Sequence, residues 1–79
     1  MKAERTPVTP IQTGRYRHYK GNEYEVVDVA RHSETMEELV VYRALYGERG
    51  LWVRPREMFV ELVEIGGHSV PRFQYVGPM

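Results

Sequence analysis

Glycine and proline occur so often along this chain that they restrict which secondary structures can form. Between positions 14 and 71 these residues are Gly14, Gly21, Gly47, Gly50, Pro55, Gly66, Gly67 and Pro71. Both residue types disfavour the interior of helices and strands and mark turns. Because the spacing leaves little room for helices of ordinary length, it predicts a series of short strands joined by turns.

The segments between these breakers predict two hairpins. Residues 15–19 and 24–32 flank the turn sequence KGNE, and residues 39–46 and 51–54 flank the sequence GERG. These hairpins are rich in Val, Tyr and Trp, which suit a pleated and half-buried strand. We therefore expect two antiparallel strand pairs from these four segments.

Side-chain alternation indicates which face of each strand points inward. In residues 39–46 one face consists of apolar and aromatic side chains only, and we expect it to face the core. Its residues are Val40, Tyr42, Ala44 and Tyr46. Val26, Val27 and Val29 cannot all point the same way in a regular strand, so we predict a β-bulge near Val27 and Asp28.

Residues 55–76 predict one helical turn and further strands. Pro55 suits the start of a helix, so we expect a turn at residues 55–58. Residues 59–65 fit either a short helix or a strand, and we favour a strand; a last strand at 72–76 follows the Gly66–Gly67 turn. The whole pattern predicts an all-β fold, a small SH3-like antiparallel barrel of five or six short strands with one helical turn. The barrel could be closed or half-open, and we favour closure because it would remove unpaired edges.

The expected domain organisation is simple. Pro7 and Pro10 remove two backbone donors, so we expect residues 1–13 to form a flexible leader. Residues 14–76 would form a single SH3-like barrel domain, and residues 77–79 a short tail.

Composition excludes several classes of protein. The chain has 79 residues, with 11 basic and 11 acidic side chains. This balance argues against a charged disordered tail and against a protein held to nucleic acid by net charge. The chain has no cysteine, which excludes disulfides, thiolate catalysis and thiolate-bound zinc. No apolar run approaches the ~20 residues of a membrane span and nothing resembles a signal peptide, so we expect a cytoplasmic protein without a membrane partner.

The string HSET at positions 32–35 is the first candidate site. His32 and Glu34 are two residues apart, so in an extended segment their side chains would project together. Such a pair could transfer protons or supply two ligands to a metal. The alternative is a turn in which Ser33 or Thr35 accepts hydrogen bonds from nearby amides. We favour the turn and expect no metal, because no spacing supplies a third ligand.

The second candidate site combines aromatic and basic side chains. Aromatic and basic side chains alternate beside a turn at Tyr16, Arg17, His18, Tyr19 and Lys20, and Trp52 and Arg54 share one face of the fourth predicted strand. Surfaces of this kind stack bases of single-stranded nucleic acid or hold peptides. The alternative is that the aromatic side chains fill the core. Arg72 could join the same surface or pair with Glu61 or Glu64.

Four strings together resemble a known family. RYRHYKGNEY, ARHSETMEELVVYRALYG, LWVRPREMF and VPRF are similar to short bacterial proteins grouped as domain of unknown function number 1653, over residues 14–73. The resemblance implies a bacterial protein and marks HSET and WVRP (positions 52–55) as hallmarks of one domain. It implies no catalytic residue, because the family has no assigned activity.

These observations predict a ligand- or partner-binding module without its own catalysis or cofactor. We expect its recognition surface to bring HSET and WVRP into one hollow, and its partner to be a protein or a small anionic ligand. The predicted binding residues are Tyr16, His18, His32, Glu34, Trp52, Arg54 and Arg72. Three alternatives stay open: a single-stranded nucleic-acid-binding barrel, which we do not favour, a small enzyme that uses His32 and Glu34, and a homodimer formed through an exposed edge.

Overall fold

The computed structural model describes residues 11–79 and consists almost entirely of short strands. The elements in chain order are β1 (Gly14–His18), β2 (Glu23–Arg31), β3 (Glu38–Ala44), β4 (Leu51–Pro55), α1 (Arg56–Phe59), β5 (Leu62–Ile65), β6 (His68–Pro71) and β7 (Phe73–Gly77). Most of the predicted leader lies in residues 1–10, outside the described part of the chain.

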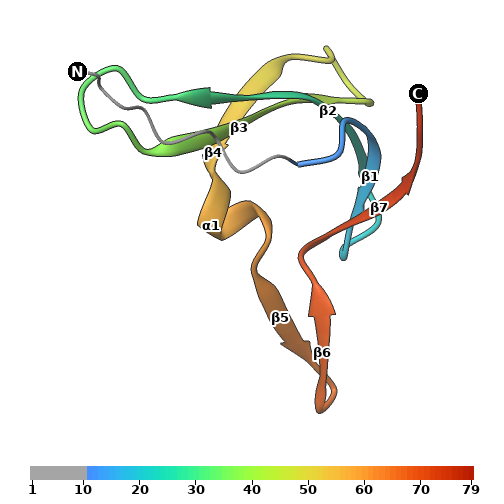
Figure 1. The fold of residues 1–79 in the computed structure, drawn as a ribbon. Helices are drawn as coiled ribbons and strands as arrows, with labels where there is room; N and C mark the ends of the chain where they lie inside the picture. The colour runs from blue at the N-terminus through green and yellow to red at the C-terminus, as the bar shows by residue number, and fades with distance from the viewer. Residues whose placement is uncertain (1–10) are drawn as a thin grey trace.

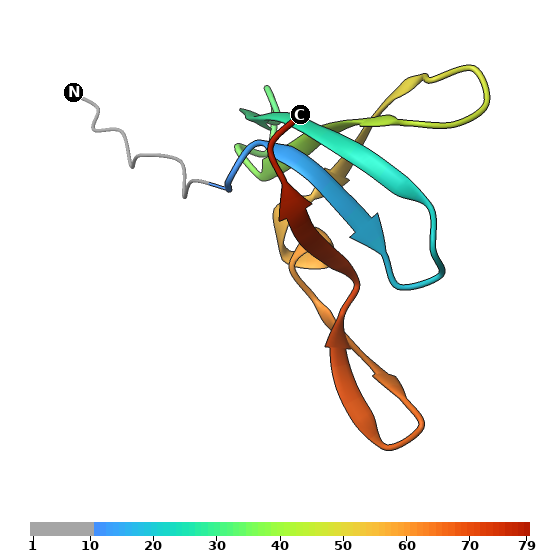
Figure 2. The same ribbon diagram turned by 90° about the vertical axis from the view of Figure 1, so that its right-hand side faces the viewer.

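The strands form two antiparallel sheets of different size. A five-stranded sheet has the order β4-β3-β2-β1-β7, and β5 and β6 form a separate two-stranded hairpin. This hairpin, here called the arm, projects away from the curved five-stranded sheet (Figures 1 and 2). Because β7 pairs with β1, the segment that follows the arm returns to the sheet beside the first strand.

The structure confirms the all-β class and the single helical turn but corrects the barrel. β4 and β7 are the two ends of the five-stranded sheet, and within residues 11–79 no pairing joins them. The sheet is therefore curved but open. Residues 11–79 also contain seven strands rather than five or six, because His68–Pro71 forms an additional strand opposite β5.

The two predicted hairpins and the bulge are confirmed. β1 pairs with β2, and β3 pairs with β4, across the turns that the sequence indicated. The register between β2 and β3 shifts between Val26 and Asp28. Val27 is the extra residue, and it is 42% exposed while Val26 is buried. The bulge thus separates the buried valine from its neighbour and bends the long strand.

The core is small and mostly aromatic. Its residues are Tyr16, Val26, Val40, Tyr42, Phe59 and Phe73. α1 contributes Phe59, whose ring stacks on Phe73 with 4.2 Å between the ring centroids. The expected strand at 59–65 therefore begins only at Leu62, since Phe59 ends the helical turn. One face of the five-stranded sheet, here called the inner face, packs on this core.

No helix within residues 11–79 is long and apolar enough to cross a membrane. The same residues contain no group of three or more His, Asp or Glu side chains that could hold a metal ion.

Candidate functional site

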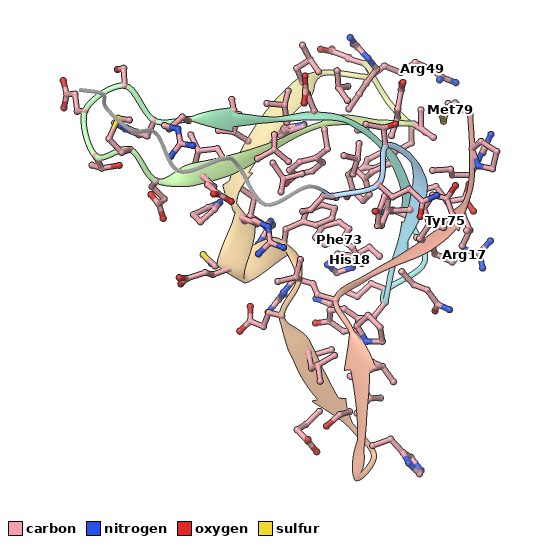
Figure 3. The ribbon with its side chains drawn as sticks, in the orientation of Figure 1. Arg17, His18, Arg49, Phe73, Tyr75 and Met79 are labelled. Atoms are coloured by element: carbon pink, nitrogen blue, oxygen red, sulfur yellow. The ribbon has the colours of Figure 1, made fainter. Side chains whose placement is uncertain are left out.

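Strand pairing brings His18 and Phe73 together at the end of the inner face. His18 in β1 lies directly opposite Phe73 in β7, so the two side chains share one face of the sheet. Their ring centroids are 4.9 Å apart, and the pair lies near the junction of sheet and arm (Figure 3). The guanidinium carbon of Arg54 lies 5.6 Å from the centre of the Phe73 ring. Phe73 therefore joins His18 to Arg54, although these residues are 36 positions apart in the chain.

Two more cations lie beside Tyr19, which follows β1. The amino group of Lys20 is 5.8 Å from the Tyr19 ring centre, and the guanidinium carbon of Arg72 is 6.0 Å from it. The Tyr19 ring is itself 4.6 Å from that of His18. Lys20, Arg54 and Arg72, with His18 between them, are here called the cationic cluster.

The surroundings of His18 favour its neutral form. Its Nδ1 accepts a hydrogen bond from the backbone N–H of Lys20 at 3.1 Å, which places the ring proton on Nε2. Burial lowers the pKa of His18, and the positive charges of Arg72, Arg54 and Lys20 lower it further. The neutral ring still offers Nε2–H as a donor, so the cluster can bind an anion without first protonating His18.

Arg54 differs from Arg72, the other arginine of the cluster, in its partners. Its Nε donates to the hydroxyl of Tyr42 at 3.4 Å, and its guanidinium lies over the Phe73 ring. Arg72 instead forms an ion pair of 3.2 Å with Glu61, which was one of the two partners predicted for it. In the described part of the chain, Arg54 has no carboxylate partner, so its charge is available to a ligand.

Trp52 lies on the same face as Arg54. Trp52 is opposite Tyr42 and Arg54 is opposite Val40, and both partners are buried on the inner face. The Trp52 side chain is nevertheless 60% exposed, because it lies on the edge strand of the sheet. The sequence predicted this pairing of Trp52 with Arg54 on one face, and within residues 11–79 the guanidinium has no carboxylate partner.

Two tyrosine hydroxyls extend this surface between β2 and the β3–β4 turn. The hydroxyls of Tyr24 and Tyr46 are 2.8 Å apart. Burial and then the hydrogen bond with Tyr46 raise the pKa of Tyr24 to about 12. The Tyr24 hydroxyl is therefore neutral near pH 7 and acts as a donor or acceptor rather than as a charge.

A hollow of about 340 Å³ adjoins the cationic cluster. The β1–β2 hairpin contributes Arg17, His18 and Tyr19 to its wall, and the arm contributes Ile65, Val70 and Pro71. It is therefore polar on the side of the sheet and apolar on the side of the arm. A ligand with an anionic group beside an apolar or flat part matches this division.

His32 and Glu34 lie elsewhere, in the turn between β2 and β3. The Nδ1 atom of His32 accepts hydrogen bonds from the backbone N–H groups of Glu34 (3.1 Å) and Thr35 (3.3 Å). The Thr35 hydroxyl accepts one from the N–H of Glu37 at 3.2 Å. These contacts favour the interpretation of HSET as a turn, in which His32 takes the acceptor role that Ser33 was considered for.

The strand register separates this turn from Trp52. Arg31, next to His32, is opposite Glu38 at the start of β3, whereas Trp52 is opposite Tyr42 farther along the same strand. The structure therefore does not bring HSET and WVRP into one hollow as predicted. The turn borders a different hollow of about 320 Å³, which Arg56 shares with the carboxylates of Glu37, Glu38 and Glu57. Three acidic groups to one guanidinium make that hollow unfavourable for an anion.

Tyr16 serves the core rather than the surface. The residue is 8% exposed, and its hydroxyl donates to the backbone oxygen of Gln12 at 2.7 Å. Its ring lies 5.4 Å from that of Phe59. Of the seven residues predicted for binding, His18, Trp52 and Arg54 lie on the inner face, and Arg72 lies beside Tyr19 between β6 and β7.

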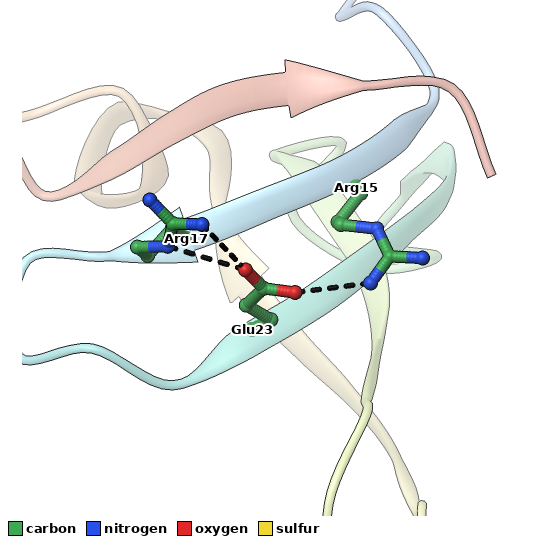
Figure 4. Close-up of polar contacts among 3 residues, drawn as sticks. All are labelled: Arg15, Arg17 and Glu23. Atoms are coloured by element: carbon green, nitrogen blue, oxygen red, sulfur yellow. Dashed lines mark hydrogen bonds and ion pairs between the residues drawn. The ribbon is translucent and has the colours of Figure 1, made fainter.

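The outer face of the sheet carries a contrasting set of arginines. Glu23 accepts hydrogen bonds from Arg15 at 3.0 Å and from Arg17 at 2.8 and 3.2 Å (Figure 4). These hydrogen bonds lower the pKa of the Glu23 carboxyl group, and the bonds from Arg17 have the largest effect. Because the Glu23 carboxylate already neutralises part of the positive charge of Arg15 and Arg17, these outer arginines are less suited to recognition than Arg54.

Sequence reasoning missed Phe73 as part of the site, and it considered Tyr19 and Lys20 in the aromatic and basic segment but left them out of the predicted binding residues. The link between His18 and Phe73 depends on the pairing of β1 with β7, which joins the two ends of the domain. The one available signal was alternation in the first strand, which places Tyr16 and His18 on one face. Nothing in the sequence indicated that the C-terminal strand would lie opposite them.

Fold and site together define a small all-β domain that carries cations and aromatic rings on one end of its inner face. A family model described as "Protein of unknown function (DUF1653)" matches residues 14–75. The chain belongs to this family, which confirms the resemblance seen in the sequence.

A solved structure supports the same assignment. The chain is similar to a crystal structure of a DUF1653 protein from Bordetella bronchiseptica, with 41% sequence identity and a TM-score of 0.80. The match covers 87% of this chain and 91% of that one. None of the curated proteins compared with the chain matches it.

Proposed function

We propose that this protein is a ligand-binding module that recognises a small anionic ligand through the cationic cluster and has no chemistry of its own. The observation that carries the proposal is the environment of Arg54. Its guanidinium lies over Phe73, near His18 and Arg72, without a carboxylate partner in residues 11–79. A phosphate or carboxylate would neutralise this local positive charge.

The neighbouring rings support a ligand with a flat part beside its anionic group. Trp52 is exposed on the face of Arg54, and the hollow beside His18 has an apolar wall. A flat ring could stack on the indole or enter this hollow while the anion contacts Arg54. Adenosine monophosphate is a suitable probe, because it carries a phosphate and a flat base.

The fluorescence of Trp52 provides a direct test, since the chain has a single tryptophan. We expect adenosine monophosphate to change the emission at low salt, with weaker responses to adenosine and to inorganic phosphate. Arg54→Gln should abolish the response to the nucleotide. The matched control is Arg43→Gln, because Arg43 lies on the outer face of β3 and bonds to the backbone of Arg49. Equal responses from both variants would contradict the proposal.

Single-stranded nucleic acid is a second candidate, favoured by the exposure of Trp52 next to Arg54. Stacking of one base on an aromatic side chain contributes ~1–3 kcal/mol. This function predicts that the affinity for an oligothymidine falls steeply as salt is added. A flat salt dependence, or no binding at low salt, would leave the small anionic ligand as the better proposal.

A further inference from the structure

β4 is an edge strand with an unusually apolar exposed surface. Leu51, Trp52 and Val53 are consecutive, and their exposed fractions are 55%, 60% and 57%. Within residues 11–79, β4 pairs with β3 alone, so its other side carries unpaired backbone groups. Proteins commonly protect such edges with charged side chains, proline or a covering segment. In β4 these features are confined to Arg54 and Pro55 at the end of the strand.

The register shows which backbone groups face outward. The N–H of Ala44 donates to the oxygen of Gly50 at 3.1 Å, so this pair is directly hydrogen-bonded. In an antiparallel pair such positions alternate, and the backbone groups of Trp52 and Arg54 therefore point toward β3. Those of Leu51 and Val53 point away from the sheet and are available to another strand.

We propose that two copies of this chain associate by antiparallel pairing of their β4 strands around Val53. In this register Val53 faces its own counterpart, and each Val53 both donates and accepts a backbone hydrogen bond. Leu51 of one copy lies opposite Pro55 of the other, where the Leu51 N–H meets the Pro55 oxygen. Pro55 has no N–H, so the ladder ends there.

Side-chain complementarity selects a second copy as the occupant of this edge. Residues directly opposite each other share a face, so Trp52 of each copy lies beside Arg54 of the other. This arrangement pairs each guanidinium with an indole and keeps the two Arg54 side chains from facing each other. On the outer face Leu51, Val53 and Pro55 meet only apolar neighbours.

The pairing would also change the candidate site. Each Arg54 would receive a tryptophan from the second copy, so the surface around the cationic cluster would be built from both chains. Anion binding through Arg54 and Arg72 does not require this pairing, and each proposal can fail without the other. Because only one short strand from each copy takes part, we expect a weak dimer that dissociates on dilution.

Sedimentation equilibrium of the native chain from roughly 10 µM to 1 mM tests the proposal. We expect the mass to rise with concentration from 9.3 kDa toward twice that value. Val53→Lys should stay monomeric over this range, because two lysines would oppose each other at the symmetry axis. Val53→Pro should also stay monomeric, since it removes the outward N–H and leaves the groups that face β3 intact.

Two control variants separate this edge from other surfaces. Val53→Thr keeps the backbone and the β-branched shape and should still dimerise. Leu62→Lys removes an equally exposed apolar side chain from the arm and should also dimerise. A native chain that is monomeric at all these concentrations would overturn the proposal. It would also be overturned if folded Val53→Lys associates as strongly as the native chain, or if Leu62→Lys no longer associates. Circular dichroism of each variant verifies that it is folded, and Val53→Lys decides the test if Val53→Pro unfolds.

Discussion

The five-stranded sheet and the arm are both made of short antiparallel strands, but different interactions hold them in place. The sheet encloses Phe59 and Val26, which are each 1% exposed. In the arm, Leu62 and Ile65 are 61% and 47% exposed, and its two strands pair only with each other. A two-stranded hairpin is only marginally stable by itself in water. The sheet therefore derives its stability from burial, whereas the arm depends on the contacts at its base.

Those basal contacts converge on Arg72. Its N–H donates to the Glu61 oxygen at 2.9 Å, and its own oxygen accepts a hydrogen bond from Tyr19 at 2.9 Å. Its side chain forms the ion pair with Glu61. Arg72 therefore connects the start of β5 and the end of β6 to the five-stranded sheet, and it also belongs to the cationic cluster. The orientation of the arm and the geometry of the candidate site are coupled through it.

The largest difference between the two regions should appear when a large apolar side chain is removed. Phe59→Ala leaves a cavity beneath the sheet and should lower the free energy of unfolding by about 3–5 kcal/mol. Leu62→Ala removes a side chain that is already mostly in water, so we expect a loss below about 1 kcal/mol. Urea denaturation of both variants measures the difference. Similar losses would show that the arm is buried in solution.

A smaller difference should follow when alanine replaces a glycine. Gly14 has φ +137°, and an added Cβ would lie 2.7 Å from the oxygen of Gly77, where β1 meets β7. Gly67, in the turn of the arm, has φ +84° with no heavy atom within 4 Å of such a Cβ. We expect Gly14→Ala to lower the free energy of unfolding by about 2–3 kcal/mol, because it adds a backbone clash to the strain of a positive φ.

Gly67→Ala is the matched control for this prediction. Gly67→Ala introduces the strain of a positive φ but no clash, so it should lower the free energy of unfolding by about 1 kcal/mol. Thermal unfolding of both variants provides the measurement. Equal costs would mean that strands β1 and β7 separate easily enough to accommodate the added methyl group.

The pH dependence of stability should reveal the environment of His18. Its pKa in the folded chain lies below the ordinary value of 6.5, so the unfolded chain binds a proton more readily. The stability that the neutral ring provides is complete above pH 6.5, and it decreases as the pH falls from there through the folded-state pKa. Unfolding measured between pH 7.5 and 5 should show this decrease. His18→Gln should flatten the profile in this range, and an unchanged profile in that variant would assign the effect to another group.

The smallest effect on global stability should come from a substitution at the base of the arm. Glu61→Gln removes the ion pair with Arg72, and exposed pairs of this kind contribute less than about 1 kcal/mol. The arm itself should nevertheless open more often. Hydrogen exchange should accelerate at Val63 and Val70 in the arm and stay unchanged at Val26 and Val40 in the core. Equal acceleration at all four positions would show that arm and sheet unfold as one unit.

Local patterns predicted much of the sheet. Alternation identified Val40, Tyr42 and Ala44 as buried, and the valines at 26, 27 and 29, which cannot all share one face, located the bulge at Val27. Tyr46 completed the same pattern but is 47% exposed, because it follows the end of β3. Strand β6 was missed because His68, Ser69 and Pro71 give it no apolar alternation. Barrel closure was wrong because it requires the outer strands β4 and β7 to meet, which no local pattern specifies.

The candidate site was less predictable because it depends on contacts between distant segments. The sequence correctly placed Trp52 and Arg54 on one face, since residues two apart in a strand share a face. The joining of His18 to Arg54 through Phe73 required the pairing of β1 with β7. The separation of His32 from Trp52 follows from their different positions along β3. The roles of the seven predicted binding residues stay predictions.

The central functional claim is that the end of the inner face near Arg54 binds an anionic ligand. A ¹H–¹⁵N NMR titration of the native chain with adenosine monophosphate tests it most directly. We predict shifts at His18, Arg54, Arg72 and the Trp52 indole, none at Gly66 and Gly67 in the arm's turn, and loss of all shifts in Arg54→Gln. Shifts at the His32 turn or the outer face alone, or none at millimolar nucleotide, would contradict the account.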